Sequence, residues 1–222
     1  MSLQVSHLEE LTEPKSGVSE GDRTSYLTRL IGQYKPLAAG SSDWLQGVRD
    51  RALNLLQDQA LPSTRDEDWR FTDLAPLYRT SFQPATAVTV TAADLESWAI
   101  ADLLRIVVIN GFFAPELSTL DRLPAGLTVE SLTTADETVQ PYLAQQQGMN
   151  EVFTALNTAS FTDGVVIRIA KNQSIETPIH LLFLTVSGGV AVSPRALIIA
   201  ETGSAATLIE DYGAIAQLRT KS

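Results

Sequence analysis

The sequence predicts an α+β fold, in which an N-terminal helical and mixed domain leads into the first coils of a β-helix (β-solenoid). Apolar residues in the first part of the chain recur at steps of three and four, as amphipathic helices require. After Phe161 this period disappears, and short apolar runs alternate with Gly, Ser, Asn and Pro. Residues 165–180 also match residues 195–210 at five of 16 positions, and repeats of about this length are typical of stacked coils.

Three parts follow from this change of pattern. They are a mobile N-terminal arm (1–22), a helical and mixed domain (23–160), and the start of a β-helix core that we expect to be incomplete (161–222). Each coil of a β-helix pairs with the coils above and below it, so an incomplete core leaves an open strand edge. We expect the chain to be able to form a homodimer through this edge.

Two amphipathic helices are predicted near the start of the helical and mixed domain. The first follows Thr24 and ends before Pro36, because proline cannot continue a helix. The second follows Ser42, whose hydroxyl is expected to cap it, and its apolar stripe runs to Leu61. Arg49 lies off that stripe, so we expect it on a solvated face.

The rest of the chain predicts short helices and strands. Residues 62–84 carry four consecutive charges at 65–68 followed by large apolar side chains, and Thr72 or Asp73 is expected to cap a helical turn there. Helices are expected at 92–99, 141–148 and 150–160, and a strand at 103–109 paired with 126–132. The strands of the β-helix core are expected at 165–170, 179–186, 196–200 and 207–209.

Composition limits the partners and the compartment. The chain has 222 residues, is 44% hydrophobic and carries a net charge of −10, so it repels nucleic-acid backbones and we expect no nucleic-acid partner. No apolar run approaches the roughly 20 residues needed to span a bilayer, so we expect no membrane partner. The first residues lack the basic and apolar regions of a signal peptide and include acidic residues that transit peptides avoid, which predicts a cytoplasmic protein.

The chain offers few residues for catalysis or metal binding. It has no cysteine, which excludes thiolate catalysis and thiolate metal ligands, and its two histidines are His7 in the arm and His180 in an apolar strand. We interpret His180 as a packing or surface residue. We predict no catalytic, cofactor-binding or metal-binding residue in this chain, and no cofactor bound by the chain alone.

Other conspicuous side chains have simple structural interpretations. Adjacent carboxylates do not face one another on a helix or strand, so we interpret three acidic runs as solvated charge: Glu9-Glu10, Asp66 to Asp68 and Glu210-Asp211. The three tryptophans, Trp44, Trp69 and Trp98, are expected to anchor the core.

Two segments carry a family resemblance. Residues 63–74 (STRDEDWRFTDL) resemble the signature Arg-x-Glu-x-Trp-(Arg/Lys)-(Tyr/Phe)-(Thr/Ser)-x-Leu of the SufB/SufD family of iron-sulfur cluster assembly proteins. The second segment resembles the entry of that family into its β-helix core, with Phe153, Leu156, Asn157 and Ala159 followed by Asp163-Gly164, Val165 to Ile169, Pro178-Ile179 and Pro194-Arg195. The SufD branch fits better than SufB.

The resemblance implies a non-enzymatic scaffold subunit of the SUF iron-sulfur cluster assembly complex, of which this chain is the N-terminal part. In that complex SufD pairs with SufB, and both bind an ABC-type ATPase, SufC. The resemblance places the SufC-docking region and the cluster-assembly residues outside this chain, so no site residue is carried over. Iron-sulfur clusters are bound mainly by thiolates, and this chain has no cysteine, so the cluster would be handled by the assembled complex.

Two other functions are compatible with a β-solenoid. The first is an enzyme acting on polysaccharide, which would need carboxylates aligned on successive coils. When the two copies of the repeat are superimposed, Asp163 aligns with Ser193, and Glu210 with His180, so no acidic row is expected. The second is an interaction module that adds strands from a partner to its open edge.

Overall fold

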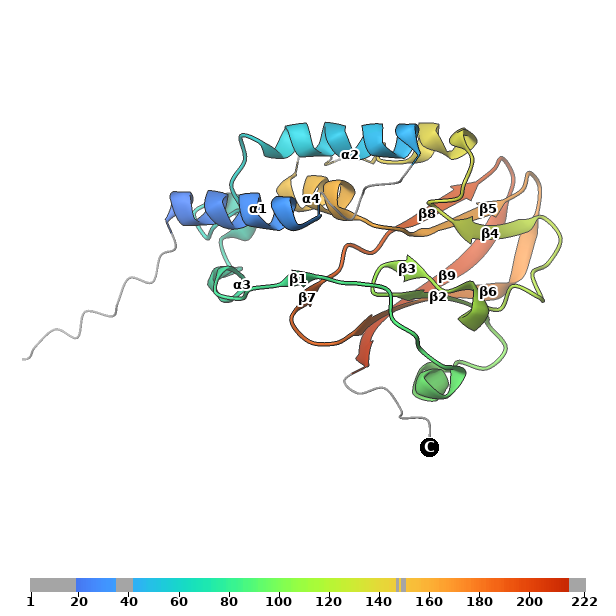
Figure 1. Cartoon of the computed structure of the whole chain (residues 1–222). Coiled ribbons are helices and arrows are strands. Elements are labelled where there is room, and N and C mark those ends of the chain that lie inside the picture. The colour runs from blue at the N-terminus through green and yellow to red at the C-terminus, as the bar shows by residue number, and fades with distance from the viewer. Residues whose placement is uncertain (1–18, 35–41, 147, 149–150, 216–222) are drawn as a thin grey trace, which may run out of the picture.

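Three α-helices pack together at one end of two stacked β-sheets, and one of them extends over a sheet (Figure 1). The computed structural model describes residues 19–34, 42–146, 148 and 151–215. The α-helices are α1 (Glu20–Tyr34), α2 (Asp43–Leu56), the short α3 (Ala75–Tyr78) and α4 (Val152–Ser160). Four 3-10 helices connect the larger elements: η1 (Glu67–Trp69), η2 (Ala92–Trp98), η3 (Pro115–Leu117) and η4 (Glu137–Tyr142).

The strands form two main sheets and one small parallel pair. Their bounds are β1 (Gln83–Pro84), β2 (Leu104–Ile109), β3 (Phe112–Phe113), β4 (Leu127–Ser131), β5 (Val165–Ile169), β6 (Ser174–Val186), β7 (Val190–Ala191), β8 (Ala196–Ala200) and β9 (Ala205–Ile215). The sheets have the orders β3-β2-β6-β9, β4-β5-β8 and β1-β7. The structure combines α-helices with separate β-sheets, which confirms the α+β class. No sheet closes into a barrel among the described residues.

The chain visits the two main sheets alternately and returns beside its earlier strands. It runs from β5 in one sheet to β6 in the other, and then from β8, parallel to β5, to β9, parallel to β6. The sequence repeat predicts Arg195 beside Val165, whereas the structure has Ala196 there, one residue later. On β6 the repeat predicts Ile209 beside Ile179, whereas the structure has Leu208, one residue earlier, because the register shifts between Ile175 and Ile179.

Four groups of buried side chains form the core. Ile106 and Val108 of β2 pack with Ile167 and Leu181 between the two sheets. The opposite face of β2 and β6 packs against η2. The outer face of β5 and β8 packs against α2 and η4, and α1, α2 and α4 pack on one another. Helices therefore lie over the β4-β5-β8 sheet, and η2 lies beyond the other sheet.

Arg49 contradicts the expectation of a solvated face, because its side chain is completely buried. Its Nε donates to the Phe161 carbonyl (3.1 Å), and its Nη2 donates to the Thr162 carbonyl (3.3 Å). The guanidinium also lies 4.5 Å from the centre of the Phe161 ring. The backbone between α4 and β5 needs hydrogen-bond donors there, and a buried arginine supplies them.

Three local predictions also differ from the structure. Residues 126–132 contain β4, which pairs antiparallel with β5 instead of with β2, because β5 offers an edge in the sheet beneath α2. The helix expected at 141–148 is shorter and begins earlier: η4 covers only residues 141–142 of that range and ends at Tyr142, after which Ala144 has a positive φ of 58°. Ser42 occupies the N-cap position of α2, but its side chain makes no capping hydrogen bond.

Other boundaries agree or extend further than predicted. Helix α1 starts at Glu20, within the predicted arm, and the rest of that arm, 1–18, lies outside the described ranges. The Asp73 carboxylate accepts a hydrogen bond from the Ala75 N–H (2.9 Å) at the start of α3, but the N-cap position itself is Leu74, directly after the two predicted caps. The last strand is longer than 207–209, because β9 follows the whole length of β6 and each pairs its backbone groups with the other.

Candidate functional site

Residues 62–74, which we call the Trp69 loop, are shaped by a local carboxylate. Asp66 accepts hydrogen bonds from the Ser63 backbone N–H (2.7 Å) and from the Ser63 hydroxyl (3.2 Å). The Ser63 N–H lowers the pKa of Asp66, with smaller contributions from the Ser63 hydroxyl and the charge of Arg23. The carboxylate is therefore ionised at neutral pH and closes the turn that leads into η1.

Contacts with α1 and α4 fasten the Trp69 loop to the helical layer. The Trp69 ring packs on Phe153 of α4 with ring centres 5.2 Å apart. Arg23 of α1 donates from Nη1 to the Leu61 carbonyl (2.7 Å) and lies 4.0 Å from the Asp66 carboxylate. The loop thus joins two helices that are distant in the sequence, and the charge of Arg23 is compensated within it.

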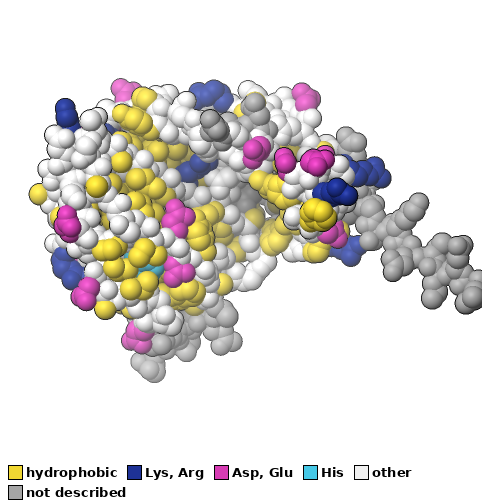
Figure 2. All heavy atoms as spheres, turned by 180° about the vertical axis from the view of Figure 1, so that it is seen from behind, with side chains coloured by type: hydrophobic (Ala, Val, Ile, Leu, Met, Phe, Trp, Pro, Cys, Tyr) yellow, Lys and Arg dark blue, Asp and Glu magenta, His cyan; other side chains and the backbone are white. Residues whose placement is uncertain are grey.

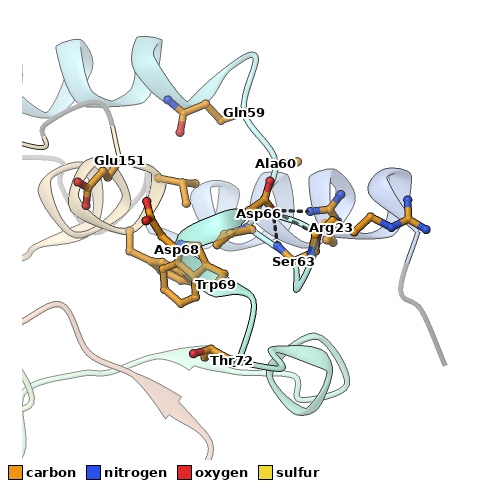
Figure 3. Close-up of a pocket in the computed structure, with 13 residues that line it drawn as sticks. Arg23, Gln59, Ala60, Ser63, Asp66, Asp68, Trp69, Thr72 and Glu151 are labelled. Carbon is orange, nitrogen blue, oxygen red and sulfur yellow. Dashed lines mark hydrogen bonds and ion pairs between the residues drawn. The ribbon is translucent and has the colours of Figure 1, made fainter.

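A pocket of about 1060 Å³ opens between the Trp69 loop, α1 and the start of α4 (Figure 3). Trp69 and Phe153 supply its aromatic surface, and Asp68 and Glu151 supply carboxylates. Figure 3 shows these two carboxylates on the same side of the pocket, with the Trp69 ring beside Asp68. Neither carboxylate makes a hydrogen bond or an ion pair within the described part of the chain.

Phe71 extends the apolar character of the Trp69 loop into solvent. Its side chain is 93% exposed, and the Arg70 guanidinium lies 5.5 Å from the centre of its ring. A large aromatic side chain so fully exposed on an ordered loop is the kind of anchor that protein interfaces bury.

The edges of β8 and β9 are a second candidate surface. Each is the last strand of its sheet among the described residues. Large apolar side chains are exposed along them, namely Ile198, Ile209 and Tyr212. Figure 2 shows hydrophobic side chains gathered over the half of the molecule that contains the sheets, with acidic side chains between them. An unpaired parallel edge of this kind can accept another strand.

The predicted acidic pair 210–211 lies at this edge, and Glu210 is engaged by its neighbour Tyr212. Tyr212 stacks on Phe183 with ring centres 4.8 Å apart, and its hydroxyl donates to the Glu210 carboxylate (2.9 Å). Although the side chain is largely exposed, the partial burial of Tyr212, followed by the hydrogen bond to Glu210 and the charge of Glu210, raises its pKa to about 12. A neutral phenol therefore lies beside a carboxylate on the face of β9 that carries Leu208.

His180 lies between neighbouring strands of the four-stranded sheet. The register places it beside Arg105 of β2 and Ile209 of β9, and its Nε2 lies 3.6 Å from the Asp211 carboxylate. The imidazole is completely buried, and neither ring nitrogen has a hydrogen-bond partner within the described residues. It is thus a residue of the sheet interior, with Asp211 as its nearest acidic neighbour.

The remaining sequence candidates do not converge. His7, Glu9 and Glu10 lie outside the described residues. Within the described ranges, no three His, Asp or Glu side chains are grouped so that they could hold a metal ion. Trp44 and Trp98 are partly buried and pack against the core, whereas Trp69 lines the pocket.

The geometry also gives no row of carboxylates for a polysaccharide-acting enzyme among the residues that the structure describes. Asp163 accepts hydrogen bonds from the Phe113 N–H (3.0 Å) and the Ser131 hydroxyl (2.7 Å), so it connects β3, β4 and the start of β5. The register places Glu210 beside Leu181 and not beside His180. The two carboxylates that this alternative requires therefore have local structural roles.

Sequence reasoning missed the part of the pocket that comes from α4. Glu151 and Phe153 adjoin the Trp69 loop only in space, and no pattern in the sequence joins the two segments. The available signal was that Trp69 and Phe153 both belong to the segments that carry the family resemblance.

The described helices also include none that is long and apolar enough to cross a membrane.

Comparison with known proteins identifies the family. A family model described as the N-terminal region of SufBD proteins matches residues 22–181, which include the Trp69 loop and α4. The chain belongs to the SufB/SufD family. The resemblance found in the sequence is thereby confirmed, and the matched region extends from α1 into β6.

Three known proteins are similar in sequence to this SufB/SufD-family chain. An iron-sulfur cluster assembly SufBD family protein of Synechocystis is 41% identical over 81% of the chain and 42% of its own length. The iron-sulfur cluster assembly protein SufD of Bacillus subtilis is 26% identical over 76% of the chain and 41% of its own length. The chloroplastic protein ABCI7 of Arabidopsis thaliana is 22% identical over 76% of the chain and 38% of its own length. The chain therefore spans about two-fifths of the length of these relatives.

Proposed function

We propose that this SufB/SufD-family chain is the N-terminal part of a non-enzymatic scaffold subunit in a SUF-type iron-sulfur cluster assembly complex. The observation that carries the proposal is the family match over residues 22–181, together with relatives whose names state iron-sulfur cluster assembly. The described residues add a pocket and two strand edges suited to binding other polypeptides. A scaffold needs such surfaces.

In this proposal the strands from β5 to β9 are the first coils of a β-helix. The parallel pairing of β5 with β8 and of β6 with β9 supports it, because each pair joins one coil to the next. Gly164 supports it as well, because a Cβ atom there would lie 2.6 Å from the Arg195 carbonyl oxygen of the next coil. Such a close approach between successive coils leaves no space for a side chain.

The cluster itself would be held outside this chain. Iron-sulfur clusters are bound mainly by cysteine thiolates, and the sequence has no cysteine. A SufB-like scaffold and a SufC-like ABC ATPase are the partners we propose, with the ATPase supplying energy and the cluster as cargo of the assembled complex. We place this complex in the cytoplasm, the compartment that the sequence predicts.

Coexpression tests the proposal. The gene product that carries this sequence is expressed with an affinity tag, together with the SufB-type and SufC-type proteins of the same organism. We expect the three to copurify in fixed proportions. Purification of the tagged protein without either partner would refute the assignment. The 222-residue chain by itself should not form a stable complex with the SufC-type ATPase, because the family resemblance places that contact outside it.

The open edges of β8 and β9 favour a second candidate, an interaction module that pairs with a second copy of the chain. Exposed Ile198 and Ile209 on these strands support it. Sedimentation velocity of the 222-residue chain should show a dimer, and the double substitution I198K/I209K should yield a monomer, because edge lysines oppose strand addition. A wild-type chain that stays monomeric at all concentrations would exclude this candidate.

A further inference from the structure

We propose that the pocket beside the Trp69 loop is a docking site for a segment of another protein that carries an arginine or lysine side chain next to apolar residues. This proposal rests on the geometry of residues in α1, the Trp69 loop and α4. It does not depend on the cluster-assembly role of the chain. The cationic group would lie against Trp69, between the carboxylates of Asp68 and Glu151.

The charges of the pocket favour a cationic occupant. Arg23 and Asp66 lie 4.0 Å apart and compensate one another, and the Leu61 carbonyl also accepts a hydrogen bond from Arg23. Asp68 and Glu151 have no such partner within the described residues. The exposed Arg65 is the remaining cation of the lining, so two uncompensated carboxylates and one guanidinium leave the pocket with a net negative charge.

The aromatic surface of the pocket suits the same group. The Trp69 ring is only partly buried by Phe153, so part of it is available to a ligand. Tryptophan is the aromatic side chain that attracts cations most strongly, and a guanidinium can lie flat on its face. In Figure 3 the ring lies beside the Asp68 carboxylate. A cation there would meet the ring and a carboxylate together.

The size of the site and its surroundings indicate a polypeptide as the occupant. The pocket volume of about 1060 Å³ is at the upper end of sites that hold whole small molecules, and far exceeds one side chain. Phe71, 93% exposed on the same loop, offers an apolar contact for residues beside the cation. The net charge of −10 would also attract a basic segment at long range.

Selection from a random-peptide display library on the immobilised 222-residue chain tests this proposal. We expect a class of binders in which Arg or Lys stands next to apolar residues. For a synthetic peptide of this class, D68N/E151Q should weaken binding by about tenfold, and replacing its arginine by the neutral isostere citrulline should have a similar effect. Binding should also weaken as salt is raised, since salt screens exposed charges.

A matched variant controls for net charge. D121N/E116Q removes the same charge from exposed positions on the strand side of the molecule and should leave binding unchanged. All four substitutions are at exposed positions, so both variants should unfold at the wild-type urea concentration. The proposal is wrong if no cationic class is selected, if D68N/E151Q binds such peptides as tightly as wild type, or if the control loses as much affinity.

Discussion

Arg49 is the side chain whose removal should most clearly show how the helical layer is attached to the sheets. It is completely buried, and it donates hydrogen bonds to the carbonyls of Phe161 and Thr162 at the start of the strand region. Burial lowers the pKa of Arg49, and the charge of Asp163 opposes that effect. An arginine guanidinium keeps its charge in folded proteins. Arg49→Met keeps most of the apolar stem and removes the charge and the donors.

The expected cost of R49M follows from these contacts. Each hydrogen bond from a charged group contributes about 1.5–3 kcal/mol, and the contact with the Phe161 ring adds about 0.5–2 kcal/mol. Relief of the cost of burying the guanidinium offsets part of that sum. We therefore expect the free energy of unfolding to fall by about 3 kcal/mol, close to the cost of breaking a buried ion pair.

Urea unfolding followed by tryptophan fluorescence and circular dichroism measures this change. With a slope of about 2 kcal/mol/M, a loss of about 3 kcal/mol lowers the midpoint by about 1.5 M. Arg51→Met is the control, because Arg51 is exposed on the same helix and its loss should change stability by less than about 0.5 kcal/mol. A shift below about 1 kcal/mol for R49M, or an equal shift for R51M, would refute the reasoning.

Three further predictions concern single positions. Gly213→Ala would place a Cβ atom 1.9 Å from the Trp98 ring, so we expect the free energy of unfolding in urea to fall by about 1–3 kcal/mol. A variant as stable as wild type would show that the ring moves freely. Gly32→Ala has open space in α1 and should stabilise the chain by about 0.5–1 kcal/mol in the same assay, and no gain would argue against a formed helix there. Tyr212 should ionise near its pKa of about 12 in an ultraviolet titration, read as the difference between wild type and Y212F. Its raised pKa stabilises the fold fully below about pH 10 and progressively less as pH rises toward 12, and E210Q should lower that pKa. Ionisation at pH 10 in wild type would contradict both the partial burial of Tyr212 and its hydrogen bond to Glu210.

Local sequence patterns predicted those elements whose side chains repeat along one face. The apolar stripe of α2 is of this kind, because the helix buries one side of itself. The short apolar run of β5 was readable for a different reason, because that strand is buried on both faces. The family signature around Trp69 was also readable, since it depends on consecutive residues. The burial of Arg49 was not, because the carbonyls that it binds lie in a distant segment.

The exact register of the paired strands was likewise not predictable from the sequence repeat. The sequence repeat indicated that the segments 165–180 and 195–210 are neighbours, yet the partner of Val165 lies one residue beyond the predicted position and the partner of Ile179 one residue before it. A register shift between Ile175 and Ile179 accounts for the difference, and similar residues at a single shift cannot locate it. The pairing of β4 with β5 likewise depends on which edge is free once the sheets have formed.

The sequence by itself determined the α+β class, the change from helical to strand pattern after Phe161, the family, and the absence of cysteine ligands. These follow from composition, periodicity and consecutive motifs, which need no knowledge of distant contacts. Only the tertiary structure decided that Glu151 and Phe153 complete the pocket beside Trp69, and that β8 and β9 carry the open edges of the described sheets. Both depend on the packing of segments far apart in the chain, where burial and hydrogen-bond geometry select one arrangement among many.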